Sequence, residues 1–170
     1  MIGFSAAAVL SMVIFTGGIF AGYRINLTAS EPLGLWRIRH LDRPVRVGDL
    51  VFVCPPDTPT FTEARLRGYL HRGLCPADYA PLIKTVIATA GQRVDIGAFV
   101  RIDGLSIPQT AIAPLDGKGR TLKTGYGGSI PDGSIFLHSP YSASWDSRYF
   151  GPIPASGVLG LAQEVLTFAP

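Results

Sequence analysis

The chain has 170 residues, of which 15 are Lys or Arg and 12 are Asp or Glu, for a net charge of +3. This length is enough for one domain with a hydrophobic core, and nothing in the composition indicates a second domain. The basic residues are scattered and form no run interleaved with aromatic side chains, so nucleic-acid binding is not indicated.

The chain begins with an uncharged, mostly apolar segment, since its first charged residue is Arg24. Crossing a bilayer takes roughly 20 apolar residues, so residues 1–23 are predicted to form a transmembrane anchor and residues 24–170 the functional domain. A cleaved signal peptide is the alternative, although such peptides usually begin with Lys or Arg and none precedes this segment. Arg24, Arg37 and Arg39 follow the anchor and suit contact with an anionic lipid bilayer.

Two sequence features disagree on the side of the membrane where the domain lies. The positive-inside rule, applied to the arginines after the anchor, places the domain in the cytoplasm. Cys54 and Cys75 have no metal-ligand spacing, and a pair of cysteines suits one disulfide in an oxidising compartment. Two free buried thiols are the alternative, so these residues alone leave the side open.

The domain is predicted to be a compact, mainly antiparallel β domain with one short helix. The helix is expected over residues 61–72, because Thr60-Phe-Thr-Glu63 is a capping-box pattern and Gly73 follows. It connects the two cysteines, and a disulfide there contributes on the order of 3 kcal/mol in the loop-entropy model. Runs rich in Val and Ile predict strands at 47–53, 81–88, 135–137 and 158–168.

The remaining segments are predicted to be turns and loops. Asp103-Gly104 predicts a hairpin within residues 93–107. The glycines of residues 114–134 lack the strand-before and helix-after context of a phosphate loop, so no nucleotide and no other cofactor is expected. Residues 139–151 are expected to form a polar loop.

Two residues that are distant in the sequence are candidates for chemistry. Ser30 lies in Asn26-Leu-Thr-Ala-Ser30-Glu-Pro-Leu-Gly-Leu-Trp36, a constrained turn that is predicted to be neither helix nor sheet; Ser30 is an aimed nucleophile or an ordinary turn serine. Lys84 lies in a strand with apolar residues on both faces, where burial disfavours the ammonium form and lowers the lysine pKa. A neutral lysine amine can act as a general base, unless the side chain snorkels to solvent.

A polar cluster, Ser142-Ala-Ser144-Trp-Asp146-Ser-Arg148-Tyr-Phe-Gly151, can supply groups that orient the lysine, or it is a solvated turn. An Asp146 to Arg148 contact is expected to hold this loop. A Ser-His-Asp triad of Ser30, His138 and Asp146 is a competing interpretation.

Taken together, these stretches resemble the membrane-anchored Ser-Lys peptidases of the type I signal peptidase (S26) family, and most closely the short peptidases of conjugative transfer. The similarity rests on an N-terminal anchor, Ser30 with Pro32 after it, Val47-Gly-Asp-Leu-Val51, Lys84 in Ile83-Lys-Thr-Val-Ile87, and Asp146-Ser-Arg-Tyr-Phe-Gly151. These pieces occur in the family's order over nearly the whole chain. One departure is Glu31, where signal peptidases have a Met.

The resemblance implies a role for each matching residue. It makes Ser30 the nucleophile, Lys84 the general base and Asp146 a residue important for activity. It makes Thr28 a hydroxyl that helps the Ser30 amide form the oxyanion hole, and Ser144 a hydroxyl that fixes the lysine. Arg148 would shape the loop with Asp146, and no metal is implied.

The resemblance also implies a location and an activity. The domain is expected on the periplasmic side of the inner membrane, which overrides the positive-inside rule and allows a Cys54–Cys75 disulfide. The expected activity is maturation of a membrane-embedded pilin precursor by cleavage and cyclisation, in contact with other proteins of a conjugation apparatus. The alternatives are a general signal peptidase that releases exported preproteins, and a catalytically inactive assembly factor.

Overall fold

The computed structural model describes residues 17–169. Most of the anchor predicted over residues 1–23 lies outside this range; residues 17–20 are helical and Tyr23 is already the first residue of a strand. No helix within the described residues is long and apolar enough to span a membrane.

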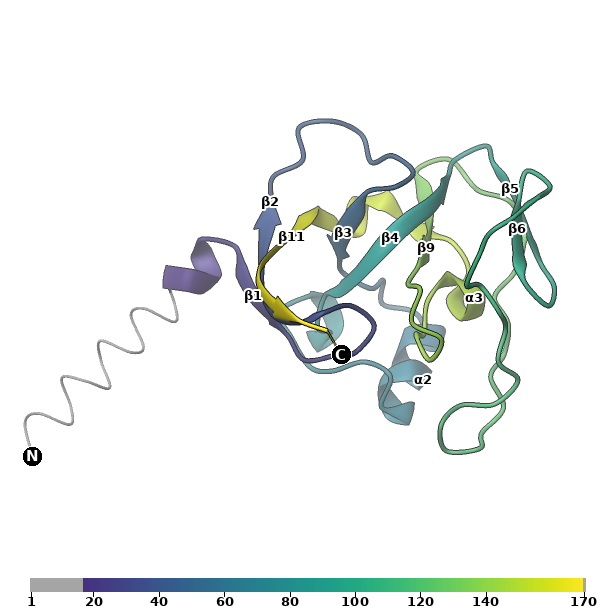
Figure 1. Ribbon diagram of the computed structural model, residues 1–170, viewed down its shortest axis with the longest axis horizontal. Helices are drawn as coiled ribbons and strands as arrows, with labels where there is room; N and C mark the ends of the chain where they lie inside the picture. The colour runs from purple at the N-terminus through teal and green to yellow at the C-terminus, as the bar shows by residue number, and fades with distance from the viewer. Residues whose placement is uncertain (1–16, 170) are drawn as a thin grey trace, which may run out of the picture.

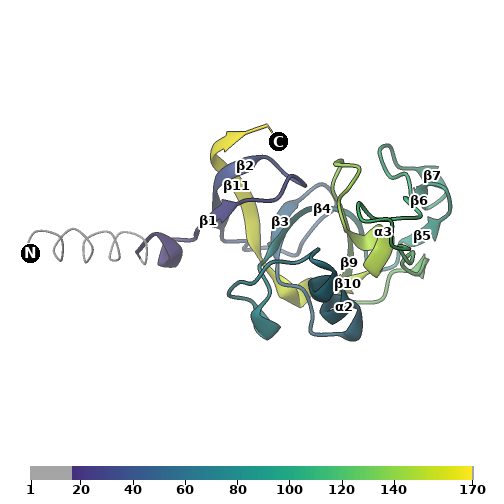
Figure 2. The ribbon, with the colours of Figure 1, turned by 90° about the horizontal axis from the view of Figure 1, so that it is seen from below.

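Two antiparallel sheets form the domain, which confirms the predicted mainly β fold. The larger sheet has the strand order β1-β2-β11-β3-β4-β9-β10, and the smaller has the order β7-β6-β5-β8. Figures 1 and 2 show β1, β2 and β11 at one end of the molecule and the smaller sheet at the other. The strands of the larger sheet are β1 (Tyr23–Asn26), β2 (Leu33–Arg39), β3 (Leu50–Val53), β4 (Leu82–Thr89), β9 (Ser134–His138), β10 (Ile153–Pro154) and β11 (Val158–Phe168). Those of the smaller sheet are β5 (Arg93–Ile96), β6 (Val100–Ile102), β7 (Leu105–Ser106) and β8 (Gly128–Ser129).

Strand β11 holds the larger sheet together, because it pairs with β2 along one part of its length and with β3 along another. Next to the bulge between Glu164 and Leu166, Gly34 of β2 pairs with Thr167. Gly34 has a φ of +129°, and an added Cβ atom would collide with the Leu166 carbonyl oxygen. A glycine is therefore required where these two strands approach each other. The prediction that residues 26–36 avoid sheet structure was wrong for Asn26, which ends β1, and for residues 33–36, which begin β2.

The helix α2 (Pro59–Arg67) is shorter than predicted and begins two residues earlier. Its N-cap is Thr58 with no side-chain capping bond, so the capping box at Thr60 and Glu63 was wrong; Glu63 pairs with Arg67 instead, at 2.6 Å. Pro59 suits the first helical position because it needs no N–H partner there. The helix ends at Gly68, which adopts the left-handed conformation and stops it before residue 72.

Three other predicted boundaries change. The strand expected from residue 47 begins at Leu50, and the region 93–107 contains three strands, with Asp103-Gly104 joining β6 to β7. Asp103 and Gly104 have φ values of +50° and +81°, as a tight hairpin turn requires. The loop 139–151 contains a one-turn helix, α3 (Ser147–Phe150), because Asp146 caps it by accepting a bond from the Arg148 amide.

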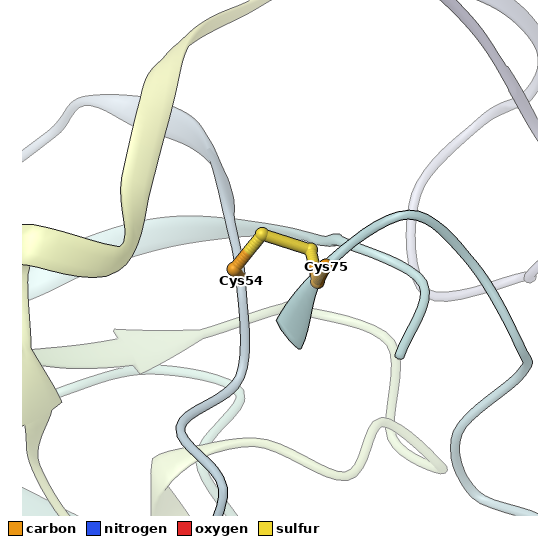
Figure 3. Close-up of a disulfide and its surroundings, with 2 residues drawn as sticks. All are labelled: Cys54 and Cys75. Atoms are coloured by element: carbon orange, nitrogen blue, oxygen red, sulfur yellow. A yellow bond between two sulfur atoms is a disulfide. The ribbon is translucent and has the colours of Figure 1, made fainter. Parts of the chain in front are cut away.

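A disulfide between Cys54 and Cys75 closes the segment that carries α2, and its Cα atoms are 5.5 Å apart (Figure 3). The alternative of free thiols is therefore excluded. The same segment packs on the loop 139–151, since the Phe61 ring meets Trp145 at 5.3 Å and Phe150 at 5.0 Å between centroids. The disulfide-closed segment thus supports the loop that bears Asp146 and Arg148.

Candidate active site

Ser30 lies in the loop that joins β1 to β2, and the loop is closed by the pairing of Asn26 with Gly34. The Ser30 carbonyl oxygen accepts a hydrogen bond from the Ser139 hydroxyl. Ser139 follows β9 directly, so this bond ties the serine loop to the end of a central strand. The Ser30 hydroxyl remains available to another partner.

That partner is Lys84. Its Nζ atom lies 2.9 Å from Ser30 Oγ and 3.1 Å from the Ile83 carbonyl oxygen, to which it donates. Lys84 lies opposite Val51 in the pairing of β3 with β4. Its side chain is 2 % exposed, so the lysine does not snorkel to solvent. The fold thus joins two residues that are separated by 53 others in the sequence.

Burial lowers the pKa of the Lys84 amine from its ordinary value of 10.5 to about 8. The negative charges of Asp146 and Glu31 oppose this shift, and the positive charge of Arg148 adds to it. Near neutral pH, an amine with a pKa of about 8 is neutral in a minority of molecules, and an ordinary lysine is almost entirely charged. The Lys84 amine also lies within hydrogen-bonding distance of the Ser30 hydroxyl. The pair can therefore perform nucleophilic catalysis with the lysine as base.

Asp146 and Arg148 make the expected contact and are both fully buried. Arg148 Nε donates to Asp146 Oδ1 at 2.8 Å, and Nη2 donates to Oδ2 at 3.0 Å. Arg148 also donates to the carbonyl oxygens of Ala111 and Ser144, while Asp146 accepts from the Ser139 amide. The pair therefore holds the loop together, and it fixes Ser139, which in turn bonds to Ser30.

The two hydroxyls carried over from the resemblance lie close to the site. The Thr28 hydroxyl donates to Asn26 Oδ1 at 2.7 Å, so its single hydrogen is engaged within the serine loop. Ser144 is buried, and its Oγ has no hydrogen-bond partner among residues 17–169. The roles assigned to these hydroxyls remain predictions.

The alternative triad is not assembled. The buried His138 ring has its Nε2 atom 3.1 Å from the Gln109 carbonyl oxygen, and within residues 17–169 it forms no hydrogen bond with Ser30 or Asp146. Burial also lowers the His138 pKa below its ordinary value. Among the described residues, no group of three or more His, Cys, Asp or Glu side chains is arranged to hold a metal ion.

Two residues that contact the serine loop were missed by sequence reasoning. Asn26 bonds to the backbone on both sides of Ser30, and Ser139 bonds to the Ser30 carbonyl. An Asn two to four residues before a turn is typical of local side-chain to backbone bonding, and this was the available signal for Asn26. No local pattern indicates Ser139, because its contact with Ser30 spans 109 positions.

Comparison with known proteins identifies the family. The model of the family "Signal peptidase, peptidase S26" matches residues 1–167. The chain is 58% identical to a "Probable conjugal transfer protein TraF" of Sinorhizobium fredii (strain NBRC 101917 / NGR234), over 100% of this chain and 90% of that protein. It is 55% identical to a "Conjugal transfer protein TraF" of Agrobacterium tumefaciens (strain 15955), over 98% of this chain and 94% of that protein. A "Plasmid transfer protein TraF" of Escherichia coli is 37% identical, over 98% of this chain and 93% of that protein. The chain therefore belongs to the peptidase S26 family of signal peptidases.

Proposed function

We propose that the chain is a Ser-Lys peptidase of conjugative transfer, which matures a pilin precursor through an acyl-enzyme. The observation that carries this proposal is the 2.9 Å contact between Lys84 Nζ and Ser30 Oγ in a site where burial lowers the lysine pKa to about 8. The names of the relatives, which refer to conjugal or plasmid transfer, support a substrate in that process.

Neutral Lys84 takes the proton of Ser30 Oγ while this oxygen attacks the carbonyl carbon of the scissile peptide. The oxyanion that forms is held by the Ser30 amide. The Thr28 hydroxyl is the second predicted donor, and its hydrogen has to turn from Asn26 Oδ1 to the oxyanion; loss of one such donor typically costs about 2.7 to 4 kcal/mol. The intermediate collapses, the C–N bond breaks, and the leaving nitrogen receives the proton from the Lys84 ammonium. The remaining acyl group is an ester on Ser30.

A second nucleophile resolves this ester, again with neutral Lys84 as the base. Attack by water releases a carboxylic acid and completes a hydrolysis. Attack by the amino terminus of the substrate forms a new peptide bond and closes a ring. In both cases Ser30 Oγ leaves and recovers its proton from Lys84, so the cycle needs no cofactor.

The location of the domain is part of the proposal. An anchor over residues 1–23 in the inner membrane would keep Ser30 within about 25 Å of the bilayer, even with the connecting residues fully extended. That distance suits a substrate embedded in the same membrane. The Cys54–Cys75 disulfide supports a domain on the periplasmic side, where thiols are oxidised.

Mass spectrometry of a pilin precursor incubated with the purified chain tests the proposal. Loss of a peptide indicates hydrolysis, and loss of a peptide plus one further water indicates cyclisation. Cleavage of exported preproteins with no action on the pilin precursor indicates a general signal peptidase, and an unchanged mass for every substrate refutes the enzyme in favour of an assembly factor.

Matched variants assign the activity to the site. Ser30→Ala and Lys84→Met should be inactive, whereas Ser106→Ala and Lys118→Met change exposed residues outside the site and should retain activity. His138→Gln should also retain activity, and a loss there would support the triad.

A further inference from the structure

Asn26 makes an unusual number of contacts with the serine loop. It is the last residue of β1, and it is 8 % exposed. Its Oδ1 atom accepts hydrogen bonds from the Thr28 amide at 3.1 Å and the Thr28 hydroxyl at 2.7 Å. Its Nδ2 atom donates to the carbonyl oxygens of Thr28 at 2.9 Å, Glu31 at 2.9 Å and Pro32 at 3.0 Å.

These contacts saturate the carboxamide. An amide nitrogen has two hydrogens, and here three carbonyl oxygens share them, while the amide oxygen uses both of its acceptor positions. The bonded groups lie on both sides of Ser30 in the chain. The side-chain bonds of Asn26 therefore take the place of the strand pairing that the loop lacks, and they fix the backbone conformation on both sides of Ser30.

Two further bonds fix the same loop from outside. Trp36 Nε1 donates to the Pro32 carbonyl at 2.9 Å, and the Ser139 hydroxyl donates to the Ser30 carbonyl. All of these bonds hold the backbone and leave Ser30 Oγ to Lys84. Among them, Asn26 is the residue that spans both flanks of the serine.

We propose that Asn26 is a positioning residue that holds Ser30 Oγ against Lys84 and toward the scissile carbonyl. This inference rests on the proposed peptidase function. A displacement of about 1 Å at a reacting group can lower the rate by on the order of 100-fold. Removal of Asn26 should therefore affect the chemical step more than substrate binding, because the loop relaxes while the rest of the sheet remains.

Asn26→Asp is the sharpest variant, since it keeps the size of the side chain. It replaces the Nδ2 donor with an oxygen, which then faces the Thr28, Glu31 and Pro32 carbonyl oxygens and repels them. Asn26→Ala removes the contacts without adding repulsion. Thr110→Val is the matched control: Thr110 is fully buried and bonds to Val100 and Ile107 near the smaller sheet, so its loss lowers stability away from Ser30.

The experiment measures kcat and KM on a pilin precursor, together with the thermal melting of each variant. We expect Asn26→Asp and Asn26→Ala to lose about 100-fold or more in kcat, with KM changed less than about threefold. Thr110→Val should melt at a lower temperature and keep a kcat within about twofold of the original chain. If Asn26→Asp does not fold, Asn26→Ser, which keeps one donor and one acceptor, should show an intermediate loss of kcat.

Folded Asn26 variants with nearly unchanged kcat would overturn the inference. A loss that matches the loss in Thr110→Val at an equal folded fraction would overturn it too, because it would show a purely structural role. In both cases the unmodified chain is active, so the proposed function stands. An unmodified chain that leaves every substrate unchanged would overturn the function and the inference together.

Discussion

Lys84→Met should make the domain more stable at neutral pH while it abolishes activity. Met has nearly the same length as Lys but carries no charge, so the variant removes the cost of keeping a buried ammonium. The Lys84 pKa falls from 10.5 to about 8 on folding. At about 1.4 kcal/mol per unit of pKa, the buried charge destabilises the fold by about 3 kcal/mol when the lysine is protonated in both states.

This cost depends on pH with a definite sign. Between pH 8 and 10.5 the unfolded chain keeps the lysine proton and the folded chain has lost it, so the stability of the unmodified chain rises with pH in this window. The methionine variant has no such group. Its advantage in unfolding free energy should therefore be largest at pH 7 and should decrease by about 2 to 3 kcal/mol at pH 10.

Urea denaturation of both proteins at pH 7 and pH 10 measures this change. The lost hydrogen bonds to Ser30 and Ile83 and the packing of the new side chain contribute equally at both pH values, so they cancel in the comparison. Lys118→Met, at an exposed position, should show no change with pH. An advantage of Lys84→Met that is the same at both pH values would refute the assignment of a burial-lowered lysine pKa.

Three further predictions concern the groups around this pair. Glu31→Gln should shift the midpoint of the acidic limb of the kcat/KM profile to lower pH, because the Glu31 charge raises the Lys84 pKa; a shift to higher pH would contradict this. Asp146→Asn should reduce the unfolding free energy in urea by about 3 to 5 kcal/mol, since it leaves the buried Arg148 charge without its partner. The exposed pair Arg93–Asp95 provides the control, and Asp95→Asn should change stability by less than about 1 kcal/mol. Replacement of both Cys54 and Cys75 by Ser should lower the unfolding free energy by about 3 kcal/mol in the loop-entropy model. An unchanged urea denaturation midpoint would show that the disulfide does not stabilise the fold.

The central strands were predictable because their signal is local. A run of apolar residues around Lys84 indicates a strand buried on both faces, and β4 occupies nearly the predicted range. The last strand, Val158–Phe168, has the predicted bounds. The same run left two possibilities for Lys84, a buried amine or a side chain that snorkels to solvent, and the structure shows the buried amine.

The support of the serine loop was not predictable in the same way. Strand β2 was missed because its residues contain Gly34 and follow Pro32, both of which indicate a turn when the β11 partner is unknown. The Ser139 contact joins segments that are distant in the sequence, and no periodicity marks such a contact. The meeting of Ser30 with Lys84 was expected only through the family resemblance, since each residue has an ordinary structural explanation when it is considered alone.

The electrostatics of the site show why the Asp146–Arg148 pair has to be complete. Asp146 is the charge that most opposes the lowering of the Lys84 pKa, and Arg148 acts in the other direction. Without Arg148, the carboxylate would raise the Lys84 pKa further and reduce the fraction of neutral amine, which is the form that acts as the base. Arg148 offsets part of the effect of this carboxylate on the Lys84 pKa, and its two bonds to Asp146 fix the loop, so the aspartate can hold Ser139, and through it Ser30, while burial still lowers the lysine pKa to about 8. The same ion pair therefore orders the backbone of the site and leaves burial as the dominant influence on its base.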